Sequence, residues 1–138
     1  MVYRKESIIK RIEKLKEYLE DLRPYGGMSV DAFTASKTER YAVERILFLI
    51  AECIIDVLDH CLSAKHGVVS ESYEDVIDNA FANKLIDAGM HEQLKGLGGF
   101  RNVLAHGYLK IDSAETHANM MKMLSMLDGV IRRFGEMV

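Results

Sequence analysis

One long helical pattern, from Ser36 to about Ala64, constrains the fold of this 138-residue chain more than any other feature. Its apolar positions recur at alternating spacings of four and three residues, which places them along one face of a helix. The seam comprises Val43, Leu47, Ile50, Ile54, Val57 and Cys61, and Ile46, Phe48, Leu49 and Leu58 widen it around most of the circumference. Because a helix of this kind is packed on several sides, we predict that it runs through the centre of the fold.

The two ends of this predicted helix carry boundary signals. Ser36-Lys37-Thr38-Glu39 is a capping-box pattern, in which Ser36 is the N-cap and Glu39 reaches back toward it. Gly67 lies just beyond Ala64, where glycine commonly ends a helix. The pattern therefore predicts one helix that Ser36 caps and that ends near Ala64.

Four polar residues interrupt the apolar surface of this helix, namely Arg45, Glu52, Asp56 and Asp59. Their spacings of seven, four and three residues place them on one shared face. This face is either a solvated stripe or the lining of a cleft or subunit interface. The second interpretation makes Glu52 and Asp56 candidate cleft-lining residues.

The rest of the chain also indicates helices, because it contains one proline and few runs of β-branched residues. A first helix is predicted over residues 3–22 and ends before Pro24, and residues 28–35 form a connector with at most one short turn of helix. Ser72 and Asp112 are predicted N-caps of two later helices. The predicted inward-facing residues are Ile8, Ile12, Leu15, Leu19 and Leu22 in the first helix, Val76, Ile77, Ala80 and Phe81 after Ser72, and Met120, Met123, Leu124, Leu127, Ile131 and Phe134 in the last helix.

A further helix is predicted from about residue 90 to 106, after a break near residues 87–89, although it contains Gly96, Gly98 and Gly99. Each glycine costs up to ~1 kcal/mol in a helix interior. Two explanations compete. The glycines allow a neighbouring helix or subunit to approach closely, or they interrupt the helix so that a new one begins near Phe100. The first is favoured, because helical spacing of apolar residues continues through the glycines.

These patterns together predict an all-α fold, an up-and-down bundle of four to five helices in a single domain spanning residues 1–138. The chain is 49% hydrophobic and 28% charged, as is usual for a soluble globular protein. Its net charge of -3 argues against a broad surface that coats nucleic acid, but it is compatible with a small local basic pocket.

The cysteines and apolar runs indicate a cytoplasmic protein without a membrane segment. Cys53 and Cys61 lie two turns apart on the long helix, about 12 Å by rise, which is too far for a disulfide. No signal peptide opens the chain, and no apolar run is long enough to span a bilayer. The histidines and cysteines lack the spacing of a zinc site. We expect neither a metal nor an organic cofactor.

The segment from Gly99 to Tyr108 gathers an arginine, an amide, a histidine and a tyrosine among small and apolar residues. Asn102 and His106 are (i, i+4) neighbours on a helix, whereas Arg101 lies ~140° from His106, so that only its long side chain would bring the guanidinium near the imidazole. Gly107 suits the C′ position, which places His106 in the last turn of the helix. An arginine that braces a phosphate and a histidine that titrates near neutrality are a minimal set for phosphodiester cleavage without metal. The plainer interpretation is a helix-capping histidine and a solvated arginine.

The spacing Arg-x-x-x-x-His-x-Tyr, formed by Arg101, His106 and Tyr108, resembles the signature of HEPN-domain RNases, in particular the HepT-like toxins. The similarity extends from about residue 36 to 134. It includes Glu39-Arg40, Ser72-Tyr73, Gly99-Phe100-Arg101-Asn102 and Tyr108-x-x-Ile111-Asp112 in order and spacing. Gly107, between the histidine and the tyrosine, is a departure that affects where Tyr108 points.

The resemblance implies a metal-independent endoribonuclease toxin built as a helical bundle. It assigns Arg101 and His106 as catalytic residues, Asn102 as a supporting residue, and Tyr108 as the site where an antitoxin attaches AMP. The implied partners are an RNA substrate, a cognate minimal nucleotidyltransferase antitoxin and a second copy of the chain in a homodimer. The alternative is a catalytically silent HEPN-like module that binds a partner nucleotidyltransferase or a nucleotide.

Overall fold

The computed structural model describes residues 2–138, and every regular element in that range is helical. The α-helices are α1 (Lys5–Leu22), α2 (Val30–Ala35), α3 (Lys37–His66), α4 (Tyr73–Ala82), α5 (Ala88–Leu94), α6 (Leu97–His106) and α7 (Ser113–Met137). Two short 3₁₀ helices, η1 (Arg23–Gly27) and η2 (Tyr108–Lys110), follow α1 and α6. The predicted all-α bundle is therefore confirmed.

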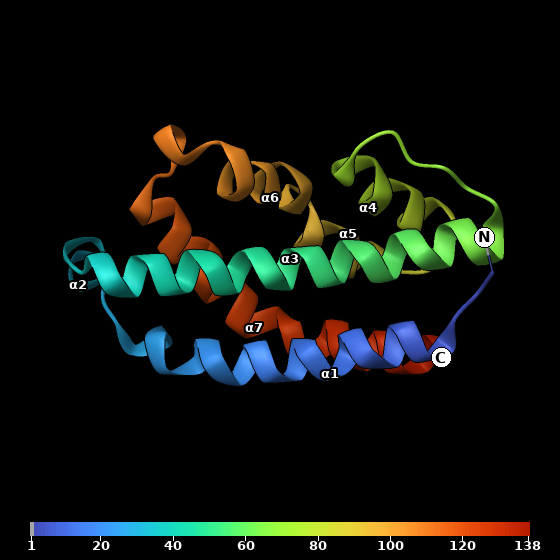
Figure 1. Cartoon of the computed structure of the whole chain (residues 1–138), viewed down its shortest axis with the longest axis horizontal. Coiled ribbons are helices and arrows are strands. Elements are labelled where there is room, and N and C mark those ends of the chain that lie inside the picture. Colours follow the sequence, from blue (N-terminus) through green and yellow to red (C-terminus); the bar gives the residue numbers. More distant parts are fainter. Residues whose placement is uncertain (1) are drawn as a thin grey trace.

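Helix α3 is the central element of the bundle, as its apolar circumference predicted. Helices α1 and α7 pack along one side of it, while α4 and α6 pack against the other, and the start of α1 and the end of α7 lie at the same end of the bundle (Figure 1). Ten residues of α3 are fully buried. This arrangement leaves α6, which carries the Arg101–His106 motif, on the outer surface of α3.

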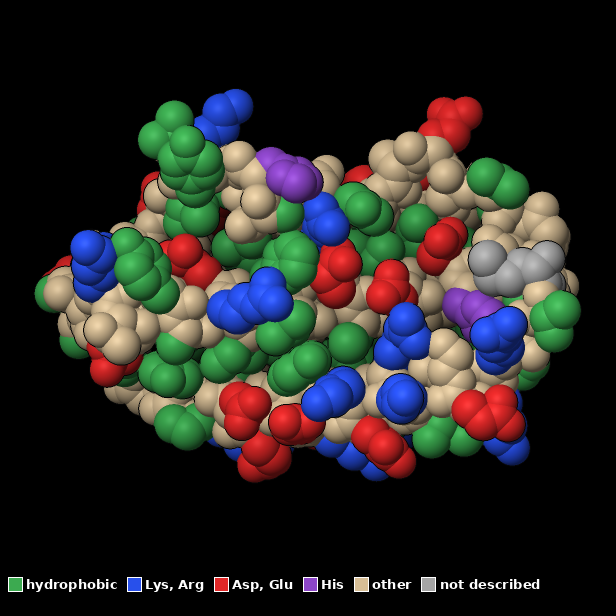
Figure 2. Space-filling view, viewed as in Figure 1, with side chains coloured by type: hydrophobic (Ala, Val, Ile, Leu, Met, Phe, Trp, Pro, Cys, Tyr) green, Lys and Arg blue, Asp and Glu red, His purple; other side chains and the backbone are tan. Residues whose placement is uncertain are grey.

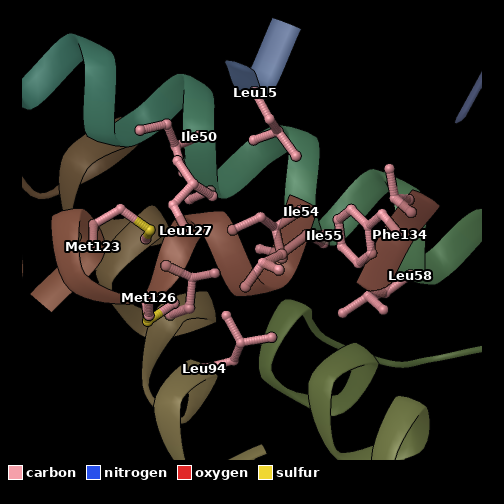
Figure 3. Close-up of a cluster of buried hydrophobic side chains, with 14 of the residues drawn as sticks. Leu15, Ile50, Ile54, Ile55, Leu58, Leu94, Met123, Met126, Leu127 and Phe134 are labelled. Carbon is pink, nitrogen blue, oxygen red and sulfur yellow. The ribbon is translucent and has the colours of Figure 1, made fainter. Parts of the chain in front are cut away.

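The core is formed where side chains from four helices meet (Figure 3). Leu15 of α1, Ile54 of α3, Leu94 of α5 and Leu127 of α7 are completely or almost completely buried there. The methionines Met123 and Met126 of α7 fill the space toward α5 and α6 with flexible thioethers. The seams predicted from sequence thus supply most of the core.

The helix ends largely follow the capping residues, with one difference at α3. Ser36 precedes α3 as predicted, but its hydroxyl bonds the Glu39 carboxylate instead of a backbone N–H, so the predicted reciprocal capping box is wrong in detail. At the other end of α3, Gly67 adopts the left-handed conformation (φ 64°). The helix ends at His66 and not near Ala64 as predicted. Ser72 and Asp112 cap α4 and α7 through their side chains.

The predicted continuous helix over residues 90–106 is wrong. Asp87 caps α5, the chain turns at Gly96 with φ 88°, and α6 begins at Leu97. Gly98 nevertheless makes the predicted close approach, since a Cβ there would lie 2.7 Å from the carbonyl carbon of Tyr73 in α4. Helical spacing persists across the break because Leu94 of α5 and Leu97 of α6 both enter the same hydrophobic core.

Phe81 is not an inward-facing residue, contrary to the prediction. It is 40% exposed, and its ring stacks on His91 with ring centres 4.5 Å apart. The predicted residues around it, Val76, Ile77 and Ala80, are buried. Cys61 is buried and Cys53 is half-buried, and both are free thiols. Within residues 2–138, none of the helices combines the length and apolar character that a membrane span requires.

Candidate active site

The start of α6 is held by a carboxylate from a different helix. Helix α6 has no side-chain N-cap of its own, and Gly96 precedes it. Glu74 of α4 accepts hydrogen bonds from the backbone N–H of Gly96 (2.8 Å) and of Gly98 (2.9 Å). A carboxylate at a helix N-terminus also opposes the positive end of the helix dipole. Helix α4 therefore fixes where α6 begins, and with it the direction of the motif.

Arg101 leaves α6 toward α3 and enters a site made by three residues. Its Nε donates to the Glu52 carboxylate at 2.5 Å. The guanidinium carbon lies 4.4 Å from the ring centre of Tyr73 and 5.1 Å from that of Phe48, distances at which cation–π attraction operates. Its side chain is only 12% exposed. A long, flexible side chain is thus fixed in one place by an ion pair and two aromatic faces.

Electrostatics keep this arginine charged and nearly neutralise its surroundings. The hydrogen bond that Arg101 donates to Glu52 is the main reason that the pKa of Arg101 is raised above its usual range. The next polar residue of the α3 stripe, Asp56, pairs with Arg11 of α1 at 3.5 Å, and burial raises the pKa of its carboxyl. Glu52 therefore lies at the motif, whereas Asp56 points to the boundary between α3 and α1.

His106 and Asn102 lie at the exposed end of α6. His106 occupies the last turn of the helix, as predicted, and its side chain faces solvent. Asn102 Oδ1 accepts a long 3.4 Å hydrogen bond from Arg101 Nη1. Arg101 and His106 make no hydrogen bond to each other within residues 2–138. Figure 2 shows a histidine beside basic and acidic side chains on the α3–α6 face of the molecule.

Gly107 ends α6 as predicted, but it does not adopt the left-handed conformation that is common for a glycine at C′. Its φ is -98°, and its N–H donates to Val103. A Cβ at this position would lie 3.2 Å from the Val103 backbone, so the absence of a side chain permits a tight exit from the helix. This turn leads directly into η2. Tyr108 and Leu109 are consequently 77% and 86% exposed, the most exposed pair of large apolar residues near the motif.

The arrangement offers a cation, an imidazole and an amide on one short helix. A guanidinium has five N–H donors, and the contacts with Glu52 and Asn102 use one N–H on Nε and one on Nη1, so the other three form no hydrogen bond within residues 2–138. The exposed imidazole of His106 carries two ring nitrogens that can donate or accept hydrogen bonds. Within residues 2–138, no three His, Cys, Asp or Glu side chains are grouped closely enough to hold a metal ion.

Sequence reasoning missed two contributors to this site. Glu74 received no predicted role, although it caps α6 across 22 residues of sequence. Tyr73 was part of the family resemblance but had no predicted role, and its ring packs against the Arg101 guanidinium. Neither function has a local sequence signal, because both depend on the packing of α4 against α6.

Comparison with known proteins assigns this chain to a family. The model of the family described as "Ribonuclease HepT-like" matches residues 10–134. The "tRNA nuclease HepT" of Aphanizomenon flos-aquae (strain 2012/KM1/D3) is 31% identical over 103 residues, which are 74% of this chain and 69% of that protein. This chain therefore belongs to the HepT-like ribonuclease family.

Two solved structures share the fold. A toxin–antitoxin structure with AMP-PNP superposes with a TM-score of 0.83 at 20% identity, covering 95% of this chain and 98% of the other. The cytosolic protein of unknown function YutE from Bacillus subtilis superposes with a TM-score of 0.77 at 23% identity, covering 99% and 92%. At these identities the likeness concerns the fold, and it extends over nearly the whole chain.

Proposed function

We propose that this protein is an endoribonuclease toxin that cleaves RNA, with tRNA as the first substrate to test, through Arg101 and His106 and without a metal ion. The observation that carries the proposal is the position of the Arg101 guanidinium, which Glu52 and Tyr73 hold in place. Arg101 lies on the same helix as the exposed His106. Membership of a ribonuclease family and the name of the cyanobacterial relative support the substrate class.

In this mechanism Arg101 stabilises the charge that develops on the phosphate. Its position is set before substrate arrives, so little reorganisation accompanies the reaction. His106 takes the proton of the ribose 2′-OH or protonates the leaving oxygen. The requirement for a 2′-OH restricts the chemistry to RNA. Asn102, one residue from Arg101, contacts the guanidinium and supports its orientation.

A second copy of the chain supplies the second histidine, so that one imidazole acts as base and the other as acid. The exposed position of His106 and the adjacent apolar pair Tyr108 and Leu109 support a homodimer across this face. The glycines preceding the motif do not add to this argument, because the close approach at Gly98 is made by α4 of the same chain. Light scattering that finds a monomer at micromolar concentration contradicts the two-histidine site.

Tyr108 is proposed as the control point, at which a minimal nucleotidyltransferase antitoxin attaches AMP. The phenol is exposed two residues beyond His106, where a partner enzyme can reach it. The added phosphate would compete with substrate for Arg101. Tyr108→Phe is expected to keep most RNase activity and to resist silencing. An AMP adduct found by intact-mass measurement on this variant, or none on the wild type after incubation with antitoxin and ATP, refutes the assignment.

Cleavage of labelled tRNA by purified protein tests the catalytic assignment. Arg101→Ala is expected to lower the rate by about 10²–10³-fold, and His106→Ala by about 10²–10⁴-fold. His66→Ala is the matched control, since His66 is also exposed in the last turn of a helix that precedes a glycine. Arg132→Ala on the exposed surface of α7 is the corresponding arginine control.

Two outcomes contradict the mechanism. One is full activity of either motif variant with an intact circular dichroism spectrum. The other is strong inhibition by EDTA that added divalent metal restores, since activity is expected to survive EDTA. A protein that binds RNA or the antitoxin but cleaves nothing would instead match the silent helical module.

A further inference from the structure

A cavity of about 510 Å³ lies between α6 and α7, on the side of α6 away from Arg101. At ~100° per residue, Phe100, Val103 and Leu104 share this face of α6, whereas Arg101 and Asn102 lie on the other. Pockets that hold small ligands are about 300–1,000 Å³ in volume. The mechanism proposed above makes no use of this space.

Much of the cavity wall is apolar and includes an aromatic ring, and Gln93, Thr116 and Asn119 add polar side chains. Phe100 and Leu104 contribute from α6, Met123 and Met126 from α7, and Leu47 from α3. Gly99 also lines it, and nothing lies within 4 Å of where its Cβ would be, so this edge is open. Aromatic and thioether side chains accept the flat face of a nucleobase without regard to its identity.

The edge of the cavity carries charges of both signs. Lys95, Lys110 and Lys122 line it together with the acids Asp112 and Glu115, and Lys95 pairs with Glu92 at 3.3 Å. Asp112 is already engaged, since one of its oxygens accepts the backbone N–H groups of Ala114 and Glu115 at the start of α7. Within residues 2–138, Lys110 and Lys122 form no ion pair. Two ammonium groups are therefore available to an anion beside an apolar chamber.

We propose that this cavity binds a nucleotide, with the base between α6 and α7 and the phosphate at Lys110 and Lys122. An apolar chamber of this volume with cations at its edge matches a ligand that is flat and apolar at one end and anionic at the other. The nucleotide comes either from the RNA substrate, in which case the inference rests on the proposed function, or from solution as a free mononucleotide.

Methionine methyl NMR tests the proposal directly, because two of the eight methionines line the cavity. On addition of 5′-AMP, 5′-GMP, 5′-CMP or 5′-UMP, the methyl signals of Met123 and Met126 are expected to shift. The signal of Met121, which is exposed on the same helix and does not line the cavity, is expected to stay in place. Absence of any shift at Met123 and Met126 with all four mononucleotides at millimolar concentration overturns the proposal.

Charge variants test the phosphate position. Exchanging both Lys110 and Lys122 for Gln is expected to weaken 5′-AMP binding by between about twofold and thirtyfold, the range for two exposed ion pairs. The same double exchange at Lys10 and Lys16 of α1, which are exposed and distant from the cavity, is the control. Adenosine should bind more weakly than 5′-AMP. Equal binding of adenosine, or no effect of the lysine variants, shows a merely apolar pocket and refutes the assignment.

The source of the nucleotide is resolved with His106→Ala, which should bind RNA without cleaving it. Shifts at Met123 and Met126 on addition of a short RNA identify a subsite for substrate, whereas shifts with mononucleotides alone identify a site for a free ligand. Wild-type tRNA cleavage is scored in parallel. Cleavage without methyl shifts refutes this inference alone, and methyl shifts without cleavage refute the proposed function alone.

Discussion

A single methyl group at Gly98 should separate α6 from α4. In Gly98→Ala the new Cβ would lie 2.7 Å from the carbonyl carbon of Tyr73 and 2.9 Å from Cα of Glu74. Favourable contacts between carbon atoms begin at about 3.5 Å, so the two helices must move apart by about 1 Å. All the atoms in the way belong to backbone, which no rotamer change can relieve.

The expected loss of stability follows from three contributions. Overpacking of this kind costs about 1–3 kcal/mol. The displacement also lengthens the hydrogen bonds from Gly96 and Gly98 to Glu74, and a bond to a charged group contributes about 1.5–3 kcal/mol. The higher helix propensity of alanine returns up to about 1 kcal/mol. We expect Gly98→Ala to lower the free energy of unfolding by about 2–4 kcal/mol.

Gly99→Ala is the matched control, one residue along the same helix. Nothing lies within 4 Å of its new Cβ, so only the propensity gain remains and stability should rise by up to about 1 kcal/mol. Urea denaturation followed by far-ultraviolet circular dichroism measures both variants. Equal midpoints for the two variants would show that the α4–α6 contact tolerates a side chain and would refute the reasoning.

Three further predictions concern residues around the motif. Tyr73→Leu should lower the rate of RNA cleavage by about threefold to tenfold, because the cation–π contact with Arg101 is lost. Tyr73→Phe keeps the ring and should retain activity. Equal cleavage rates for the two variants argue against a role for the ring. Glu74→Gln should lower the free energy of unfolding by about 1–3 kcal/mol. Glu71→Gln is the control and should leave it unchanged, because the Glu71 carboxylate has no hydrogen-bond partner within residues 2–138. The midpoints of urea denaturation measure both variants, and equal midpoints contradict the prediction. Burial raises the pKa of the Asp56 carboxyl in the folded state above its unfolded-state value. Above the folded-state pKa the charged carboxylate therefore lowers the free energy of unfolding, whereas below the unfolded-state pKa the carboxyl is protonated in both states and has no such effect. The stability of Asp56→Asn relative to wild type should therefore increase as pH rises through that window in urea titrations, and a constant or opposite difference contradicts it.

The elements that the sequence predicted well are those whose evidence is local. The seams of α1, α3 and α7 are long and strongly periodic, and Ser72 and Asp112 cap helices that begin at the next residue. The break at Gly96 was missed because the helical spacing of Leu94, Leu97 and Leu104 continues on both sides of it. Apolar periodicity shows which side of the chain faces the core. Two successive helices that pack on the same core keep the same side inward, so the pattern does not reveal the break between them.

The candidate site was predictable in its residue types and not in its contacts. Arg101 and His106 follow from the motif, but the pairing of Arg101 with Glu52 spans 49 residues. Glu52 appeared in the sequence as one member of a polar stripe, and its neighbour Asp56 gave the same signal although it pairs with Arg11. Only the packing of α6 on α3 distinguishes the two acids.

The cap that Glu74 provides also determines when the motif helix can form. A ten-residue helix is marginally stable alone, and α6 lacks an N-cap in its own sequence. Its first turn is completed only after α4 has docked, so the two helices should fold and open as one cooperative unit. In native-state hydrogen exchange, the amides of α6 and α4 should share one opening free energy, distinct from that of α1. A nascent chain would thus carry the motif residues in order, yet without the helix that aligns them, until this docking is complete.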